Sequence, residues 1–229
     1  MTARISAGAP RTQADRRART RSALLEAAAR GLSKYGYANL ALERVASEAG
    51  YTRGALYHLF ANKEDLALAV VKWVEETWNA EVGDLAAEQA EPVDALLAMA
   101  RGHAIYCRRD VADVMMTLRV EFTGQDHPIG QALTEIIDQL AADCAGLIAA
   151  GRLSGAIPAG PPPLEMAAAY LGVLEAVGSQ LAGQAPYDIE LVERAVRGLL
   201  ALPPTPRSTD PRSVGAPESP AHTETEIHA

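Results

Sequence analysis

The chain has 229 residues, 21 of them Lys or Arg and 29 Asp or Glu, with a formal net charge of −8. This length allows one large or two small domains with a sizeable core, so stabilising disulfides are not required. The two cysteines, Cys107 and Cys144, form no Cys-x-x-Cys or Cys/His cluster, which excludes a disulfide framework and a zinc pattern. No apolar run is long enough to cross a bilayer, and the start lacks the apolar segment of a secretory leader. We therefore expect a soluble cytoplasmic protein without membrane contact.

The charge is distributed unevenly along the chain. Residues 1–63 contain eleven Lys or Arg and four Asp or Glu, a net charge of +7, whereas residues 64–229 have a net charge of −15. A small basic head on a larger acidic body is expected when one end of a protein meets phosphates and the other repels them. A solvated basic face is the alternative, which charge alone does not exclude.

Helical periodicity runs through most of the chain, because apolar residues recur three and four positions apart and no stretch of five residues alternates with period two. We therefore predict an all-α protein of about nine helices. The first predicted domain, residues 18–78, contains helices over about 20–34, from Leu42 to just before Gly50, over 53–59, and from Lys63 onward.

The second predicted domain, residues 79–202, contains longer helices rich in Ala, separated by Pro and Gly. These helices lie over about 92–108, 110–122, 128–153, 163–183 and 187–201. We expect the flanking segments, residues 1–17 and 203–229, to be a disordered basic arm and a disordered tail.

Residues 41–60 have the spacing of a helix-turn-helix. Ala46 is small where two helices would cross, and Gly50 can adopt the positive φ of the sharp turn. Thr52 can cap the next helix, which Leu56 anchors to the core. The exposed start of that helix is the end that enters a DNA major groove. Helical hairpins that bind no DNA share this pattern, so the pattern alone does not decide between the two.

Side chains around this hairpin have the chemistry of DNA contacts. Arg53 can form two hydrogen bonds to a guanine, and Gly54 permits close approach of the helix. Tyr57 and His58 can donate to phosphates; the alternative is ordinary packing, which explains His58 equally well. Lys63 begins the following helix, where the helix dipole disfavours a cation, so we expect it to reach a phosphate.

The chain closely resembles the TetR family of transcriptional regulators in the run from Gly50 to Leu66, GYTRGALYHLFANKEDL, and the resemblance extends over residues 18–78. It implies a dimeric all-helical repressor whose C-terminal domain binds a small ligand. Carried over position by position, it implies DNA contacts from Thr20, Thr52, Arg53, Gly54, Tyr57 and Lys63. One departure concerns the second helix. Leu40 and Ala41 stand where the family usually has a Thr or Ser that caps this helix and touches phosphate.

The penultimate predicted helix has two apolar faces. One face consists of the small residues Ala168, Gly172, Ala176, Ser179 and Gly183, and the other of the larger residues Met166, Tyr170, Val173, Val177 and Leu181. Two faces require two partners, so we expect the helices within 163–201 to form a symmetric homodimer interface. Two DNA half-sites about 34 Å apart also require two linked heads. Burial of both faces within one chain is the alternative.

Residues 92–181 mix apolar and polar side chains, and we expect a small-molecule pocket among them. The candidates are Met99, His103, Tyr106, Met115, Met116, Arg119, Phe122 and Tyr170, although such residues at helical spacing more commonly pack in a core. A separate cluster of Glu121, Asp126 and His127 is compatible with a metal or acid/base site, but a solvated turn is the better interpretation.

These features favour a DNA-binding transcriptional regulator, a repressor that leaves its double-stranded operator when a small molecule binds the C-terminal domain. A DNA-binding regulator or nucleoid protein without such a ligand is the alternative. The sequence contains no nucleophile elbow, His-Glu-x-x-His motif or dinucleotide fingerprint. We therefore expect no enzymatic activity, no cofactor and no metal.

Overall fold

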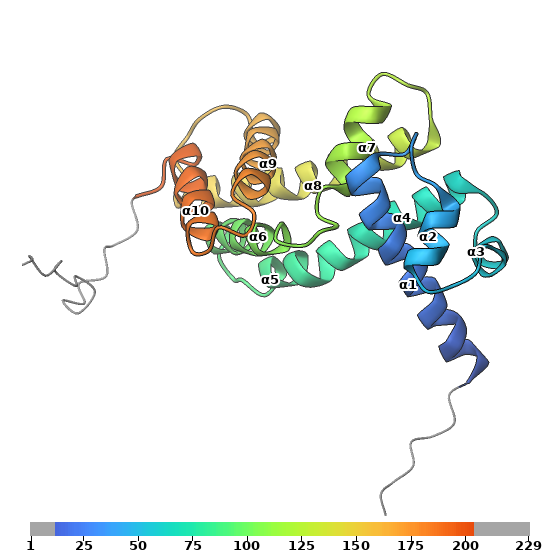
Figure 1. Ribbon diagram of the computed structural model, residues 1–229. Helices are drawn as coiled ribbons and strands as arrows, with labels where there is room; N and C mark the ends of the chain where they lie inside the picture. Colours follow the sequence, from blue (N-terminus) through green and yellow to red (C-terminus); the bar gives the residue numbers. More distant parts are fainter. Residues whose placement is uncertain (1–11, 204–229) are drawn as a thin grey trace, which may run out of the picture.

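The computed structural model describes residues 12–203, and these residues form helices and no strand (Figure 1). The all-α prediction is confirmed. The predicted arm falls mostly on residues 1–11 and the predicted tail on residues 204–229, which lie outside the described residues.

Three helices form the N-terminal head, namely α1 (Gln13–Tyr35), α2 (Leu42–Glu48) and α3 (Arg53–Leu59). They bury Leu24, Leu32, Val45 and Leu56 together with the first part of α4. The bounds of α2 and α3 agree with the prediction because each helix has a clear start or stop signal in the sequence, Thr52 before α3 and Gly50 after α2.

The start of α1 differs from the prediction. The helix begins at Gln13 rather than near residue 20, so residues 13–17 of the predicted arm are helical. Thr12 and Asp15 form a capping box. The Thr12 side chain accepts from the Asp15 N–H at 3.1 Å, and the Asp15 carboxylate accepts from the Thr12 N–H at 2.9 Å. The charged first turns project from the head and carry no apolar stripe, which is why periodicity missed them.

A single helical rod connects the head to the body. α4 (Lys63–Trp78) starts in the head, where the Asn62 side chain caps it by accepting from the Asp65 N–H at 2.8 Å. The rod continues through a π-helical turn, η1 (Asn79–Gly83), into α5 (Asp84–Ala87). Figure 1 shows α4 crossing from the head at the right towards α5 at the lower left. Counted as one helix, this rod makes nine helices within residues 12–203, in agreement with the prediction.

The body contains α6 (Pro92–Tyr106), α7 (Val114–Phe122), α8 (Pro128–Leu153), α9 (Pro163–Gln180) and α10 (Tyr187–Leu199). A proline in the first turn marks the start of α6, α8 and α9, which made these starts predictable. α7 begins later than the predicted position near 110, because residues 107–113 form turns. α6, α8, α9 and α10 pack around a second core that includes Leu96, Ile148 and Val192.

α9 has the two faces that its sequence predicts. Met166 and Tyr170 are buried in the body, whereas Ala168, Gly172 and Ala176 are exposed. Burial of both faces within one chain is therefore wrong for this helix. The exposed face is lined with small side chains, so another helix could approach it closely.

None of the helices within residues 12–203 is long and apolar enough to cross a membrane. The same residues contain no group of three or more His, Cys, Asp or Glu side chains that could hold a metal ion. Cys107 and Cys144 are both buried and free.

Candidate DNA-binding face and effector pocket

The start of α3 forms an exposed surface at the outer end of the head (Figure 1). Gly50 has a φ of +75°, which turns the chain between α2 and α3. The Thr52 hydroxyl then accepts from the Ala55 N–H at 3.2 Å and caps α3. A Cβ added at Gly54 would contact only the Thr52 hydroxyl within 4 Å. The surface around Gly54 is therefore open to a partner.

Arg53 is held by two neighbours on this surface. Its guanidinium pairs with the Glu43 carboxylate at 2.6 Å and donates to the Tyr57 hydroxyl at 3.3 Å. It also lies 5.2 Å from the centroid of the Tyr57 ring. The Tyr57 hydrogen bond, and then the charge of Glu43, raise the pKa of Arg53. Sequence reasoning missed Glu43, the acidic partner of Arg53 on this surface.

The other predicted DNA contacts differ in their surroundings. His58 is exposed on α3 and free to meet a phosphate. Thr20 lies in the second turn of α1 and not at its start, and its hydroxyl donates to the Arg16 carbonyl at 2.9 Å. Lys63 donates to the Ala38 carbonyl at 2.9 Å, so its place in the first turn of α4 has an explanation within the chain. The expected contact of Lys63 with a phosphate stays a prediction.

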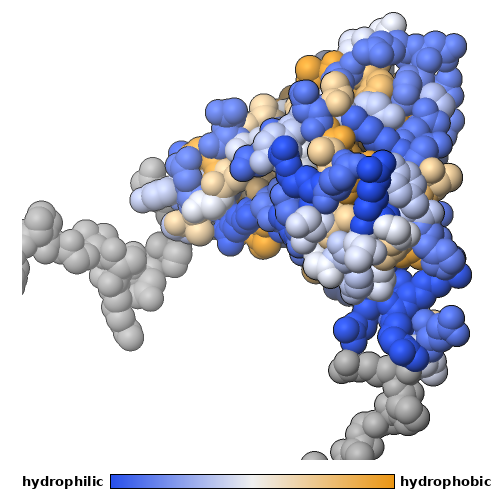
Figure 2. Space-filling view, turned by 45° about the vertical axis from the view of Figure 1, so that its right-hand side comes forward, coloured by the Kyte–Doolittle hydropathy of each residue, from blue (hydrophilic) through white to orange (hydrophobic). Residues whose placement is uncertain are grey.

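Basic side chains cluster at the exposed start of α1. Arg16, Arg17 and Arg19 are all exposed there. Figure 2 shows hydrophilic side chains over this part of the molecule, at its lower right. Such a surface adds sequence-independent attraction to phosphates.

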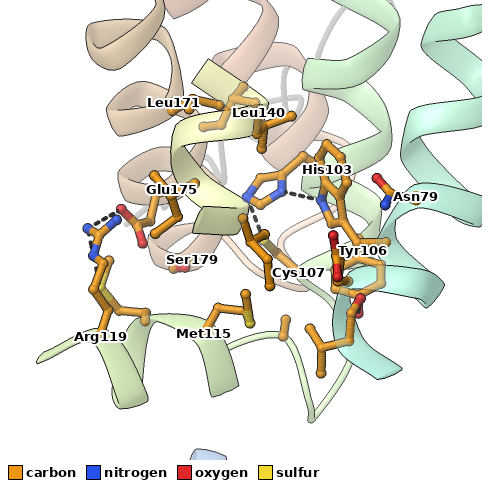
Figure 3. Close-up of a pocket in the computed structure, with 18 of the residues that line it drawn as sticks. Asn79, His103, Tyr106, Cys107, Met115, Arg119, Leu140, Leu171, Glu175 and Ser179 are labelled. Carbon is orange, nitrogen blue, oxygen red and sulfur yellow. Dashed lines mark hydrogen bonds and ion pairs between the residues drawn. The ribbon is translucent and has the colours of Figure 1, made fainter. Parts of the chain in front are cut away.

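A cavity of about 230 Å³ lies in the body, between α4, α6, α7, α8 and α9 (Figure 3). Most of its wall is apolar or aromatic. These wall residues are Val74, Trp78, Tyr106, Met115, Met116, Ile136, Ile137, Leu140, Leu171 and Leu174. The π-helical turn that follows α4 brings Asn79 to the same wall, and no sequence signal indicated this turn.

Only some of the predicted pocket residues line this cavity. His103, Tyr106, Met115, Met116 and Arg119 line it, whereas Met99, Phe122 and Tyr170 do not. Met99 and Tyr170 are corrections in favour of core packing, whereas Phe122 lines a separate cavity beside the start of α8. Met99 and Tyr170 belong to the body core, where the Tyr170 hydroxyl donates to the Leu96 carbonyl at 2.7 Å. Phe122 packs in the head core, with its ring centroid 5.3 Å from that of Tyr37.

His103 stands in the cavity wall as a neutral imidazole. The Trp78 indole N–H donates to its Nδ1 at 3.1 Å, so the proton resides on Nε2, which lies 3.3 Å from the Cys107 Sγ. Burial lowers the pKa of His103 to about 4 and raises the pKa of Cys107 to about 12. Both groups are therefore uncharged at neutral pH.

The turn between α1 and α2 is held by a residue of the body. The backbone N–H groups of Tyr37 and Ala38 each donate to a different oxygen of the Glu121 carboxylate, at 2.6 Å. Gly36 makes room for this contact, because a Cβ there would lie 2.8 Å from a Glu121 oxygen. Glu121 lies near the end of α7, two residues after Arg119, which lines the cavity. α7 therefore touches both the cavity and the head.

His127 makes a second contact between body and head. Its Nδ1 accepts from the Ile129 N–H at 3.2 Å, and its Nε2 lies 3.4 Å from the Glu64 carboxylate at the start of α4. The interpretation of Glu121, Asp126 and His127 as a solvated turn is therefore wrong for two of the three, since only Asp126 is exposed. This contact between body and head could not be predicted from the sequence, because His127 and Glu64 are far apart along the chain.

A capped, exposed helix on a basic head, joined by one rod to a helical body with an apolar cavity, defines a helix-turn-helix domain of the kind found in DNA-binding regulators. The family follows from comparison with known proteins. Residues 24–70 match the family model described as "Bacterial regulatory proteins, tetR family". This match agrees with the resemblance of the head to the TetR family that the sequence shows.

Curated relatives match a short part of the chain. The HTH-type transcriptional regulator CymR of Pseudomonas putida is 41% identical over 66 residues, which is 29% of this chain and 32% of the relative. The HTH-type transcriptional regulator TtgR, also of Pseudomonas putida, is 43% identical over 58 residues, which is 25% of this chain and 28% of the relative. The matches thus span about a third of the length of these relatives or less.

Solved structures match the whole fold. A TetR transcriptional regulator from Chloroflexus aurantiacus J-10-FL aligns with a TM-score of 0.69 at 20% identity, covering 81% of this chain and 96% of that one. AibR, in complex with isovaleryl coenzyme A and operator DNA, aligns with a TM-score of 0.67 at 20% identity, covering 80% and 99%. The body therefore shares its fold with TetR regulators.

Proposed function

We propose that the chain is a dimeric transcriptional repressor that binds double-stranded operator DNA through α3 and releases it when a small molecule occupies the cavity. The observation that carries this proposal is the exposed, capped start of α3 on a basic head, with Arg53, Gly54 and Tyr57 facing outward. Thr52, His58 and Lys63 complete the proposed DNA-binding set, with Thr20 as a contact from α1. Residues 18–78 bind DNA, and residues 79–202 bind the ligand and the second chain.

The relatives support a protein that binds both DNA and a small molecule. CymR and TtgR are similar to part of this chain and are named transcriptional regulators. The AibR structure shows that a protein of this fold can hold both an acyl coenzyme A and operator DNA. A nucleoid protein that coats DNA would have no use for the cavity in the body.

The exposed small-residue face of α9 supports the dimer. Ala168, Gly172 and Ala176 recur every four residues on one exposed face. Small side chains allow two helices to approach closely, and α10 lies beside α9 in the same chain. The proposed interface therefore consists of these two helices from each protomer. Two linked heads can then bind two half-sites together.

Coupling between ligand and DNA runs through α7 and α4. Both helices line the cavity, α7 holds the α1–α2 turn through Glu121, and α4 starts in the head. A ligand that favours another position of α7 also favours another position of the head. A coupling free energy of about 1–3 kcal/mol would weaken operator binding roughly 5- to 150-fold.

Footprinting on the DNA that flanks the coding region tests the proposal, with random competitor DNA present at fixed salt. We expect two protected half-sites about 34 Å apart, related by two-fold symmetry. Protection without sequence preference that vanishes as salt rises would favour the nucleoid protein instead.

A further inference from the structure

The ionisable side chains that line the cavity are mostly acidic. Glu75 on α4, Asp143 on α8 and Glu175 on α9 contribute three carboxylates, and Arg119 is the one cation among the described lining residues. Arg119 already pairs with Glu175 at 2.9 Å, which Figure 3 shows at the edge of the cavity. The lining therefore has an excess of negative charge that no side chain in it balances.

An anionic ligand fits this lining poorly. A ligand carboxylate would share Arg119, the one cation in the described lining, with the Glu175 carboxylate that already pairs with it. It would also meet the carboxylates of Glu75 and Asp143, whose like charge repels it. His103 offers no compensation, because burial holds its pKa at about 4 and it stays neutral.

The apolar part of the wall favours an aromatic ligand. Trp78 lines the cavity with its indole N–H already donated to His103, so its π surface is what it offers a ligand. An indole ring attracts cations as well as apolar groups. Leu140, Leu171 and Met115 add apolar surface to the wall of the cavity (Figure 3).

We propose that this cavity takes a small aromatic molecule with one positive charge, a protonated amine or a quaternary ammonium, because Glu75, Asp143 and Glu175 all line it. This inference rests on the proposed function, which makes the cavity the effector site, and it specifies the class of effector.

Three probes with one ring system test the charge preference by isothermal titration calorimetry on the full chain. They are 1-naphthylmethylammonium, 1-naphthalenemethanol and 1-naphthoate, which are cationic, neutral and anionic at pH 7. The cation is expected to bind at least about tenfold more tightly than the anion, with the alcohol between them, since one nearby charge is worth about five- to tenfold for each sign.

Two charge-removing variants locate the preference in the cavity. Glu175→Gln also frees Arg119, so it is expected to weaken the cation about five- to tenfold and to strengthen the anion. Glu165→Gln removes the same charge from α9 outside the cavity and should change neither by more than about twofold. Asp143→Asn, on the exposed rim of α8, is expected to weaken the cation about two- to fivefold, with Asp138→Asn on the same helix as its control.

Naphthoate binding as tight as the ammonium, or no binding of any of the three probes, would overturn the inference. Equal effects of the cavity variants and their controls would overturn it too. Operator binding by the same preparation without any probe reports on the proposed function separately, so its loss and the loss of cation preference are distinguishable.

Discussion

Arg53, the proposed base-reading side chain, is held by neighbouring side chains in the free protein. Glu43 and Tyr57 hold it on the surface of the head, so its guanidinium is oriented but not free. An exposed ion pair of this kind contributes little to stability, because solvent screens it. In the proposed complex, displacement of Glu43 by DNA therefore costs little free energy. Two hydrogen bonds from Arg53 to the correct guanine would favour that base over others by about 1–3 kcal/mol.

Glu43→Gln is expected to raise operator affinity about two- to fivefold, because it releases Arg53 and removes an acid from a surface that faces phosphates. Fluorescence anisotropy of a labelled operator measures this. Glu48→Gln, an exposed charge on the same helix with no contact to Arg53, serves as the control. A fall in affinity for Glu43→Gln would show that Glu43 positions Arg53 for the base and does not compete with it.

The free energy of unfolding is expected to fall by up to about 3 kcal/mol between pH 6.5 and pH 4, since His103 has its pKa lowered to about 4 in the folded chain. The unfolded chain takes up this proton near pH 6.5 and the folded chain does not, so acid favours unfolding in this window. Urea denaturation at several pH values measures the effect. His103→Gln should flatten the profile, whereas His58→Gln, an exposed histidine, should not. Identical slopes in both variants would exclude His103 as the cause.

At the scale of elements, start and stop signals decide what the sequence predicts. α3, α8 and the start of α4 were predictable because Thr52, Pro128 and Asn62 mark their beginnings. η1 was not, because a π-helical turn has no local signature and depends on what packs around it. The first turns of α1 were missed because they are helical without an apolar face.

In the proposed coupling, the contact between α7 and the α1–α2 turn transmits a movement of α7 to the head. Glu121→Gln keeps the size of the side chain but leaves one acceptor oxygen and no charge for two N–H donors. Amide hydrogen exchange of Tyr37 and Ala38 is expected to accelerate about tenfold or more, as a charge-assisted bond of about 1.5–3 kcal/mol is lost. Asp126→Asn, a nearby exposed acid, should leave both amides unchanged. Unchanged exchange in Glu121→Gln would mean that the turn is held without the carboxylate.

Over the whole molecule, the sequence predicted the basic head and the acidic body, but not how they join. The partners of Glu121 lie 84 and 83 residues away along the chain, so no local pattern reveals them. The pocket was predicted only in part, because some of its residues also come together from distant parts of the chain. His103, Tyr106 and Arg119 were found by their chemistry, whereas Glu175 and Asn79 line the cavity only through packing of distant helices.

Gly172→Glu is expected to convert the proposed dimer to a monomer, because it buries a charge at the centre of the small-residue face of α9. Sedimentation velocity measures the change. Gly146→Glu places the same side chain on α8, where a Cβ likewise meets nothing within 4 Å, and should leave the dimer intact. A dimer that survives Gly172→Glu would place the interface elsewhere.

The central claim, that α3 reads a DNA sequence, is tested most directly by the affinity of Arg53→Ala for an operator and for a scrambled duplex at the same salt concentration. The predicted result is a loss of about 1–3 kcal/mol on the operator with little change on the scrambled duplex. Arg44→Ala, which removes a charge from α2, should weaken both duplexes alike. An equal loss on both duplexes for Arg53→Ala would contradict base reading by α3 and leave Arg53 as a phosphate contact.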